Sequence, residues 1–251
     1  MMLNNSWERW FQGHSRRVAE AKLRQYQPSW QNNMRNAAKA MLAFVLAFIT
    51  IAMLSFCGMQ QAAAQTIPQA AHPHRATLTR AAHTAWGLDA PIAAVAAQVH
   101  QESGWRANAL SPVGAQGLTQ FMPATARWWC AREQQSASEC QPYNPTWALR
   151  SMVGYDKYLY DLAPPRFTPY ERLYVALRGY NGGLGHWRAE AAIAAATNHF
   201  PSLAQIDAAC GRARRAAVHC AENLGYPRRI LGDLQPRYAS WGKTLFAESK
   251  L

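Results

Sequence analysis

The segment that decides the fold is residues 101–126, Gln-Glu-Ser-Gly-Trp-Arg-Ala-Asn-Ala-Leu-Ser-Pro-Val-Gly-Ala-Gln-Gly-Leu-Thr-Gln-Phe-Met-Pro-Ala-Thr-Ala. A helical apolar stripe precedes it, formed by Ile92, Val95, Ala96 and Val99. Glu102 lies three residues after Val99, so a helix carries its carboxylate onto the side of the stripe. Ser103-Gly104 ends this helix, and we expect Asp89 to cap its start.

This placement suits Glu102 to acid chemistry. Apolar surroundings penalise a charged carboxylate, and the negative end of the helix dipole acts in the same direction, so both raise its pKa. A carboxyl that stays protonated near neutral pH can act as a general acid. A glutamate at a helix end is more often solvated, so the spacing alone does not establish catalysis.

Three motifs occur in order along the chain: Glu102-Ser103, then Gly117-Leu118-Thr119-Gln120, then Gly179-Tyr180-Asn181. Together they resemble the soluble lytic transglycosylase (SLT) domain, a goose-lysozyme-like family that cleaves bacterial peptidoglycan. The resemblance is strong over about residues 88–130 and 144–185. Thr119 stands where most members have Met, and Gly179 where they have Ala. A weaker match is Glu222-Asn-Leu-Gly-Tyr226, a stretch that lines the groove in many members.

The resemblance implies a lysozyme-like helical domain with a substrate groove and little or no β-sheet. It also implies lytic transglycosylase activity without a cofactor or a metal. Glu102 would act as single acid and base on the β-1,4 bond between N-acetylmuramic acid and N-acetylglucosamine, forming 1,6-anhydromuramic acid. The alternatives are a muramidase that hydrolyses the same bond and an inactive glycan-binding component of an envelope-spanning machine.

Other residues take roles from the same resemblance. Tyr180 would hydrogen-bond the Glu102 carboxyl, and Thr119 would change packing against a sugar. The expected substrate-binding residues are Ser111, Gln120, Met122, Tyr180, Asn181 and Glu222. Met122 is equally consistent with core packing, and we expect Asn181 to brace the helix end. We interpret Asp156 and Asp161 as solvated surface charges and Glu171 as a helix cap. Three tryptophans are candidates for sugar stacking or for buried packing: Trp105, Trp128 and Trp129.

The N-terminal part predicts export. Residues 40–59 carry no charge, and every basic residue of the first 64 precedes this run, so the positive-inside rule keeps residues 1–39 cytoplasmic. Two interpretations remain open. Residues 40–64 are a signal peptide that ends at the small residues Ala62-Ala63-Ala64, with Met1 or Met34 as its start, or residues 40–59 are a retained inner-membrane anchor. Either places the remainder in the periplasm or cell envelope.

The cysteines agree with export. Cys57 lies in the apolar run, which leaves Cys130, Cys140, Cys210 and Cys220. Each expected pair, 130–140 and 210–220, is ten residues apart and would close a local loop. A four-cysteine zinc site is disfavoured, because the spacings do not match one.

From residue 85 onward the periodicity is helical, with starts at Pro123, Asn144-Pro145 and the capping box Thr168–Glu171. We expect a lead-in over residues 65–87, the catalytic domain over 88–200 and a helical extension with a cysteine-closed loop over 201–251.

The net charge is +12, and residues 65–251 contribute +7 of it. A basic exported domain is attracted to the carboxylates of peptidoglycan and to anionic lipid. Nucleic acid is not an expected partner, because no binding motif accompanies the cluster of Arg212, Arg214, Arg215, Arg228 and Arg229. We interpret most of these arginines as solvated. Service to a secretion, conjugation or phage machine is left open.

Overall fold

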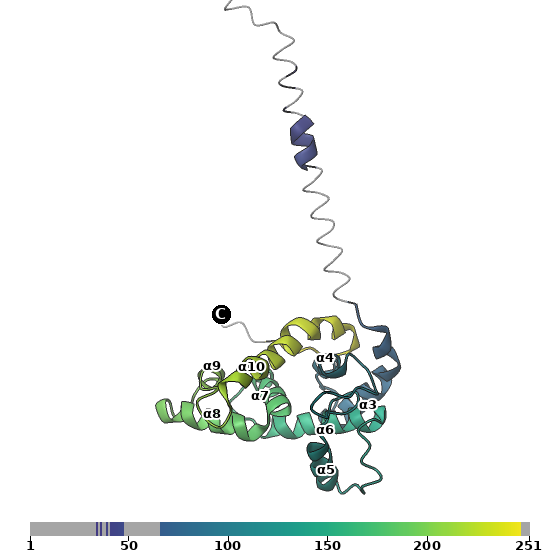
Figure 1. Ribbon diagram of the computed structural model, residues 1–251, viewed down its shortest axis with the longest axis vertical. Coiled ribbons are helices and arrows are strands. Elements are labelled where there is room, and N and C mark those ends of the chain that lie inside the picture. The colour runs from purple at the N-terminus through teal and green to yellow at the C-terminus, as the bar shows by residue number, and fades with distance from the viewer. Residues whose placement is uncertain (1–33, 35, 37–38, 40, 48–65, 247–251) are drawn as a thin grey trace, which may run out of the picture. The chain divides into compact units, whose positions relative to one another are not determined.

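The computed structural model describes residues 34, 36, 39, 41–47 and 66–246 (Figure 1). The chain divides into two units, Met1–Ala64 and Gln65–Leu251. In the first unit residues 41–47 are helical. The rest of the predicted uncharged run, Cys57 and the predicted cleavage site at 62–64 lie outside the described residues. Among the residues that are described, no helix has the length and apolar character needed to span a bilayer.

The second unit is built from helices, as predicted. Its first seven are η1 (Gln69–His74), α3 (Arg75–Trp86), α4 (Ile92–Ser103), α5 (Pro123–Arg132), α6 (Pro145–Asp161), α7 (Pro169–Gly182) and α8 (Leu184–Thr197). The remainder are α9 (Leu203–Asp207), η2 (Ala217–His219), α10 (Cys220–Arg228), the π-helical η3 (Arg229–Leu234) and η4 (Gln235–Trp241). Residues 66–246 contain no strand, only isolated bridges of Gln116 with Leu110 and Phe121.

Helix α4 is the centre of the core. Every residue from Ile92 to Val99 is buried, so the helix is covered on all sides and not only along the predicted stripe. Helices η3 and η4 pack on α4, and α3 packs on α6. In Figure 1, α7, α8, α9 and α10 gather at one end of this unit, and α3 and α4 lie at the other. The contacts of η3 and η4 with α4 bring the C-terminal part of the chain onto the central helix.

Three predicted helix starts are present. Helix α5 starts at Pro123, the Asn144 side chain caps α6, and Thr168 and Glu171 form the capping box of α7. The prediction for Asp89 was wrong. Helix α4 starts at Ile92 without a side-chain cap, and Asp89 Oδ1 instead accepts a hydrogen bond from Lys243 Nζ at 3.1 Å.

The segments on either side of the predicted catalytic domain belong to the same core. The predicted lead-in forms η1 and α3, and its Leu78 and Ala82 are fully buried. After residue 200, Tyr238 and Trp241 of η4 lie in the same cluster as α4. Removal of either segment would expose apolar surface of the central helix.

Both predicted disulfides are formed, Cys130–Cys140 and Cys210–Cys220. The first joins the end of α5 to the loop before α6. The second closes the loop between α9 and α10.

Candidate active site

Glu102 lies in the last turn of α4, and the chain turns sharply after it. Gly104 caps the helix at φ 61°, a left-handed conformation that favours glycine, and its N–H donates to His100 O at 3.0 Å. The Ser103 hydroxyl donates to Leu118 O at 2.7 Å. The neighbours of Glu102 in sequence thus fix the helix end and hold the 117–121 loop beside it.

The carboxyl of Glu102 accepts a hydrogen bond on Oε1 from the phenol of Tyr226 in α10. Burial raises the pKa of Glu102 to about 8, the Tyr226 hydrogen bond acts against this rise, and the charge of Glu222 adds to it. The side chain keeps partial contact with solvent. The protein atoms packed around the carboxyl nonetheless disfavour its charged form. With a pKa of about 8, the carboxyl is mostly protonated at neutral pH.

Two hollows meet at Glu102. The first has a volume of about 260 Å³, and its lining includes the six predicted substrate-binding residues, namely Ser111, Gln120, Met122, Tyr180, Asn181 and Glu222. The second has a volume of about 550 Å³ and is lined by residues that include Gln101, Tyr226 and Arg229. Glu102, Asn181 and Glu222 line both, so the two hollows form one groove. Glu102 therefore lies where the two hollows join.

A family model described as "Transglycosylase SLT domain" matches residues 78–200 of this chain. Residues 78–200 belong to the transglycosylase SLT family. The SLT match begins inside α3 and ends after α8, so it includes Glu102 and the two later predicted motifs but not Tyr226.

Curated relatives agree with the SLT assignment. Membrane-bound lytic murein transglycosylase F of Vibrio cholerae is 33% identical over 92 residues, which cover 37% of this chain and 16% of that protein. The protein of the same name from Alcanivorax borkumensis is 34% identical over 92 residues and covered to 18%. The aligned part of this chain thus spans less than a fifth of the length of these relatives.

Among solved structures, an inactive mutant of the lytic transglycosylase Slt from Pseudomonas aeruginosa matches with a TM-score of 0.51 at 21% identity. The match covers 68% of this chain and 25% of that one. At this identity the likeness concerns the fold alone. The predicted lysozyme-like SLT fold is confirmed.

The predicted hydrogen-bond partner of Glu102 was wrong. The Tyr180 hydroxyl donates to Thr119 O at 2.7 Å, whereas the phenol on Glu102 belongs to Tyr226. Tyr180 still lines the first hollow, and the charge of Glu102 contributes to raising its pKa well above the ordinary value, after burial. Tyr180 therefore anchors the 117–121 loop next to the acid.

Two further predictions are corrected by burial. Thr119 is fully buried, and its Oγ1 has no hydrogen-bond partner within the described residues, so its side chain does not face the groove.

Asp156 is not a solvated charge. It is fully buried and accepts a hydrogen bond from Gln98 Nε2 at 3.2 Å. Burial raises its pKa well above the ordinary value, and Glu102 contributes in the same direction. Asp161 is exposed and Glu171 caps α7, as predicted.

The groove side chains are partly held by the loop that bears them. Gln120 has φ 52°, and its Nε2 donates to Gly117 O at 2.8 Å. The Ser111 hydroxyl accepts a hydrogen bond from Ala115 N at 2.9 Å, and Met122 is 42% exposed just before α5.

The three tryptophans considered for sugar stacking lie elsewhere. Trp105 and Trp129 are buried and Trp128 is half-exposed. In the described part of the chain, none of these three lines either hollow at Glu102.

The prediction omitted Tyr226 from the site. Glu222 and Tyr226 are four residues apart, so α10 presents both on one face. The signal was in the sequence, since the stretch Glu222–Tyr226 already matched the family weakly. Only the packing of α10 against α7 and η3 reveals that the tyrosine reaches the acid.

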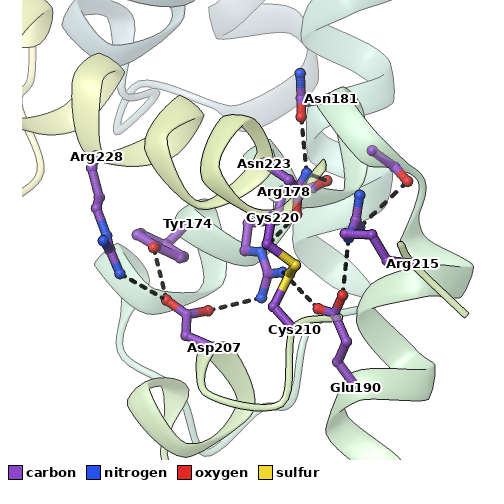
Figure 2. A network of polar contacts seen from close by, with 11 residues as sticks. Tyr174, Arg178, Asn181, Glu190, Asp207, Cys210, Arg215, Cys220, Asn223 and Arg228 are labelled. Atoms are coloured by element: carbon purple, nitrogen blue, oxygen red, sulfur yellow. Dashed lines mark hydrogen bonds and ion pairs between the residues drawn. A yellow bond between two sulfur atoms is a disulfide. The ribbon is translucent and has the colours of Figure 1, made fainter. Parts of the chain in front are cut away.

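Helix α10 is held by a buried polar network (Figure 2). Arg178 of α7 donates to Glu190 at 2.6 Å, to Asp207 at 2.8 Å and to Asn223 at 3.0 Å. Arg215 is buried and pairs with Glu190 at 2.9 Å, so it is the exception in the predicted cluster, whose other four arginines are exposed as expected. The charges of these pairs compensate one another, which limits the cost of burying them.

The network reaches the groove through amides. Asn223 Nδ2 donates to Asn181 Oδ1 at 2.9 Å, and Asn181 Nδ2 donates to Glu222 at 3.2 Å. Asn181 thus braces the helix end, as predicted. Within the described residues, no group of three or more histidine, cysteine or acidic side chains is placed to hold a metal ion.

Proposed function

We propose that this SLT domain is a lytic transglycosylase that cleaves the β-1,4 bond between N-acetylmuramic acid and N-acetylglucosamine in peptidoglycan. The observation that carries the proposal is one protonated carboxyl, Glu102, which is held by Tyr226 at the meeting point of two hollows. The names of the curated relatives, lytic murein transglycosylases, support the same substrate.

The proposed reaction uses the carboxyl twice. Glu102 donates its proton to the glycosidic oxygen as the bond from that oxygen to C1 of the muramic acid breaks, and the N-acetyl carbonyl of the same sugar stabilises C1. The Glu102 carboxylate then accepts the proton of the C6 hydroxyl, whose oxygen bonds to C1 and closes the 1,6-anhydro ring. Glu102 ends protonated, and no water is consumed. A pKa of about 8 suits both halves, since the group must give and recover a proton near neutral pH.

A muramidase is the second candidate, and one observation favours it. Glu222 lines both hollows together with Glu102, and it is exposed to solvent. Two carboxylates across a glycan are the usual arrangement for hydrolysis, in which the second activates water. The hydrogen bond from Asn181 holds Glu222 beside the groove.

The test is mass spectrometry of the muropeptides released from purified sacculi by the wild-type protein, Glu102→Gln and Glu222→Gln. The transglycosylase predicts products one water lighter than hydrolysis products, no release by Glu102→Gln and residual anhydro products with Glu222→Gln. Glu133→Gln is the matched control, an exposed carboxyl away from both hollows. Hydrated products alone would support the muramidase. Parental release by Glu102→Gln would exclude this carboxyl from the mechanism.

We further propose that the domain acts in the cell envelope. The uncharged run at 40–59, the basic residues before it and two disulfides in the exported part support this location. Cell fractionation with N-terminal sequencing distinguishes the forms: a start at Gln65 supports a cleaved signal peptide, and an intact N-terminus in the membrane fraction supports an anchor. Recovery in the cytoplasm with reduced cysteines would contradict both.

A further inference from the structure

A third hollow adjoins the groove. It has a volume of about 400 Å³ and shares Asn181 and Glu222 with the two hollows at Glu102. Its basic side chains are His186, Arg214, Arg215 and His219. We call this hollow the basic pocket. It therefore borders the groove at Asn181 and Glu222.

The two arginines of the basic pocket differ in their ion pairs. Arg214 is exposed and forms no ion pair within the described residues. Arg215 is buried, and its Nε donates to Glu190 at 2.9 Å. Its Nη2 contacts Gly182 O at 3.5 Å, and in the described part of the chain no hydrogen bond engages Nη1. Arg214 therefore supplies the uncompensated charge, and Arg215 supplies a guanidinium whose position is fixed.

The backbone at Gly182 lies close to the Arg215 guanidinium. A Cβ at Gly182 would lie 2.3 Å from Arg215 Nη1 and 2.5 Å from Asn223 Nδ2, so only glycine leaves room for both groups. His186 adds a ring nitrogen, Nδ1, that is buried without a hydrogen-bond partner among the described residues. It lies in the first turn of α8, whose N-terminal end carries the positive pole of the helix dipole.

We propose that the basic pocket binds carboxylates of the stem peptide that branches from the glycan strand in the groove. This inference rests on the proposed function and adds to it a preference for peptide-bearing strands. The peptide leaves the muramic acid sideways, so its site must lie beside the groove and not along it, which is where the basic pocket lies. Guanidinium groups are suited to carboxylates because two N–H donors can face the two oxygens.

The pocket's single carboxylate does not oppose this binding strongly. Glu222 lies at the border shared with the groove, and Asn181 Nδ2 holds one of its oxygens. Arg214 and His219 belong to the stretch that contains the Cys210–Cys220 disulfide, which restricts their movement. The pocket is therefore largely formed before a ligand arrives, which reduces the entropic cost of binding.

The experiment measures kcat/KM for three substrates: glycan strands with stem peptides, strands whose peptides an amidase has removed, and peptide-bearing strands whose carboxylates are amidated. The variants are Arg214→Gln in the pocket and Arg212→Gln as control, an exposed arginine of the same disulfide-closed loop outside the pocket lining. Both remove one positive charge, and equal melting temperatures would establish that both variants fold.

We expect Arg214→Gln to lower kcat/KM on peptide-bearing strands about three- to ten-fold more than on peptide-free strands. Amidated strands should lose the same advantage with the wild-type protein, and Arg212→Gln should match wild type throughout. Equal losses on all three substrates, or none, would overturn the basic pocket while leaving the transglycosylase intact. Failure of the wild-type protein to cleave any of them would instead contradict the proposed function.

Discussion

The phenol of Tyr226 donates a hydrogen bond to the carboxyl of Glu102 across 124 residues of sequence. This contact joins the end of the central helix α4 to α10, which lies outside the segment that matches the SLT family model. The carboxyl of the candidate site is therefore held by a residue from the C-terminal part of the chain, and this part contributes to the site.

Tyr226→Phe should lower kcat/KM on sacculi about ten-fold, because a hydrogen bond to an ionisable carboxyl is lost. The bond stabilises the carboxylate and lowers the pKa of Glu102, so its removal should also move the alkaline limb of the pH profile to higher pH. Tyr180→Phe is the control, since that hydroxyl donates to Thr119 O. An alkaline limb displaced by Tyr180→Phe and not by Tyr226→Phe would contradict the assignment.

The wild-type pH profile should itself lose activity as the pH rises through about 8, where Glu102 gives up its proton. The pKa of Glu102 is higher in the folded than in the unfolded chain, so folding takes up a proton over this pH range. The free energy of unfolding therefore falls as the pH rises from about 4.5 to 8. Glu102→Gln should thus raise the free energy of unfolding at alkaline pH by up to about 5 kcal/mol, since each unit of the pKa rise corresponds to about 1.4 kcal/mol, and should change it little at low pH. Urea titrations at both pH values measure the difference, and equal effects would contradict it.

Asp156→Asn should cost little stability at neutral pH. Burial raises the pKa of Asp156 and so favours its neutral form, and an asparagine oxygen can accept the same hydrogen bond from Gln98. Asp156→Ala should cost about 2–3 kcal/mol, because it leaves a cavity and an unpaired amide. Denaturant unfolding measures both, with the exposed Asp161→Asn as control. A large loss with Asp156→Asn would show that the residue is needed as a carboxylate.

The two disulfides provide a matched pair, since each joins cysteines ten residues apart. Replacement of either pair by serine should lower the free energy of unfolding by about 2–3 kcal/mol. Only the Cys210–Cys220 replacement should also lower kcat/KM, because its loop carries Arg215 to Glu190 beside α10. Calorimetry and muropeptide release on both variants test this, and equal activities in the two would remove the loop from the support of the site.

Two glycines of α7 should respond in opposite directions to alanine. A Cβ at Gly179 meets Leu159 at 3.4 Å, an ordinary contact, so Gly179→Ala should stabilise the protein by about 0.5–1 kcal/mol. Gly182→Ala places its methyl against Arg215 and Asn223 and should destabilise it. Thermal unfolding compares them; destabilisation by both would mean that α7 tolerates no added volume.

Local signals made several elements predictable from sequence. The caps at Asn144 and Thr168 act within a few residues, and so does the glycine that ends α4. Asp89 shows the limit even there, because Lys243 from the far end of the chain binds its carboxylate. The helix end and any opposite charge that the fold brings near compete for the same capping side chain.

By itself the sequence determined that the part of the chain after residue 65 is helical, that Glu102 ends a helix beside apolar residues, and that the cysteines pair within short loops, because these depend on spacing along one segment. Tertiary structure alone decided that Tyr226 and not Tyr180 meets the acid, that Asp156 and Arg215 are buried, and that a basic pocket opens beside the groove. Each of these depends on contacts between helices distant in the chain. Their burial and charge are set by which helix faces meet, and helical periodicity does not specify that.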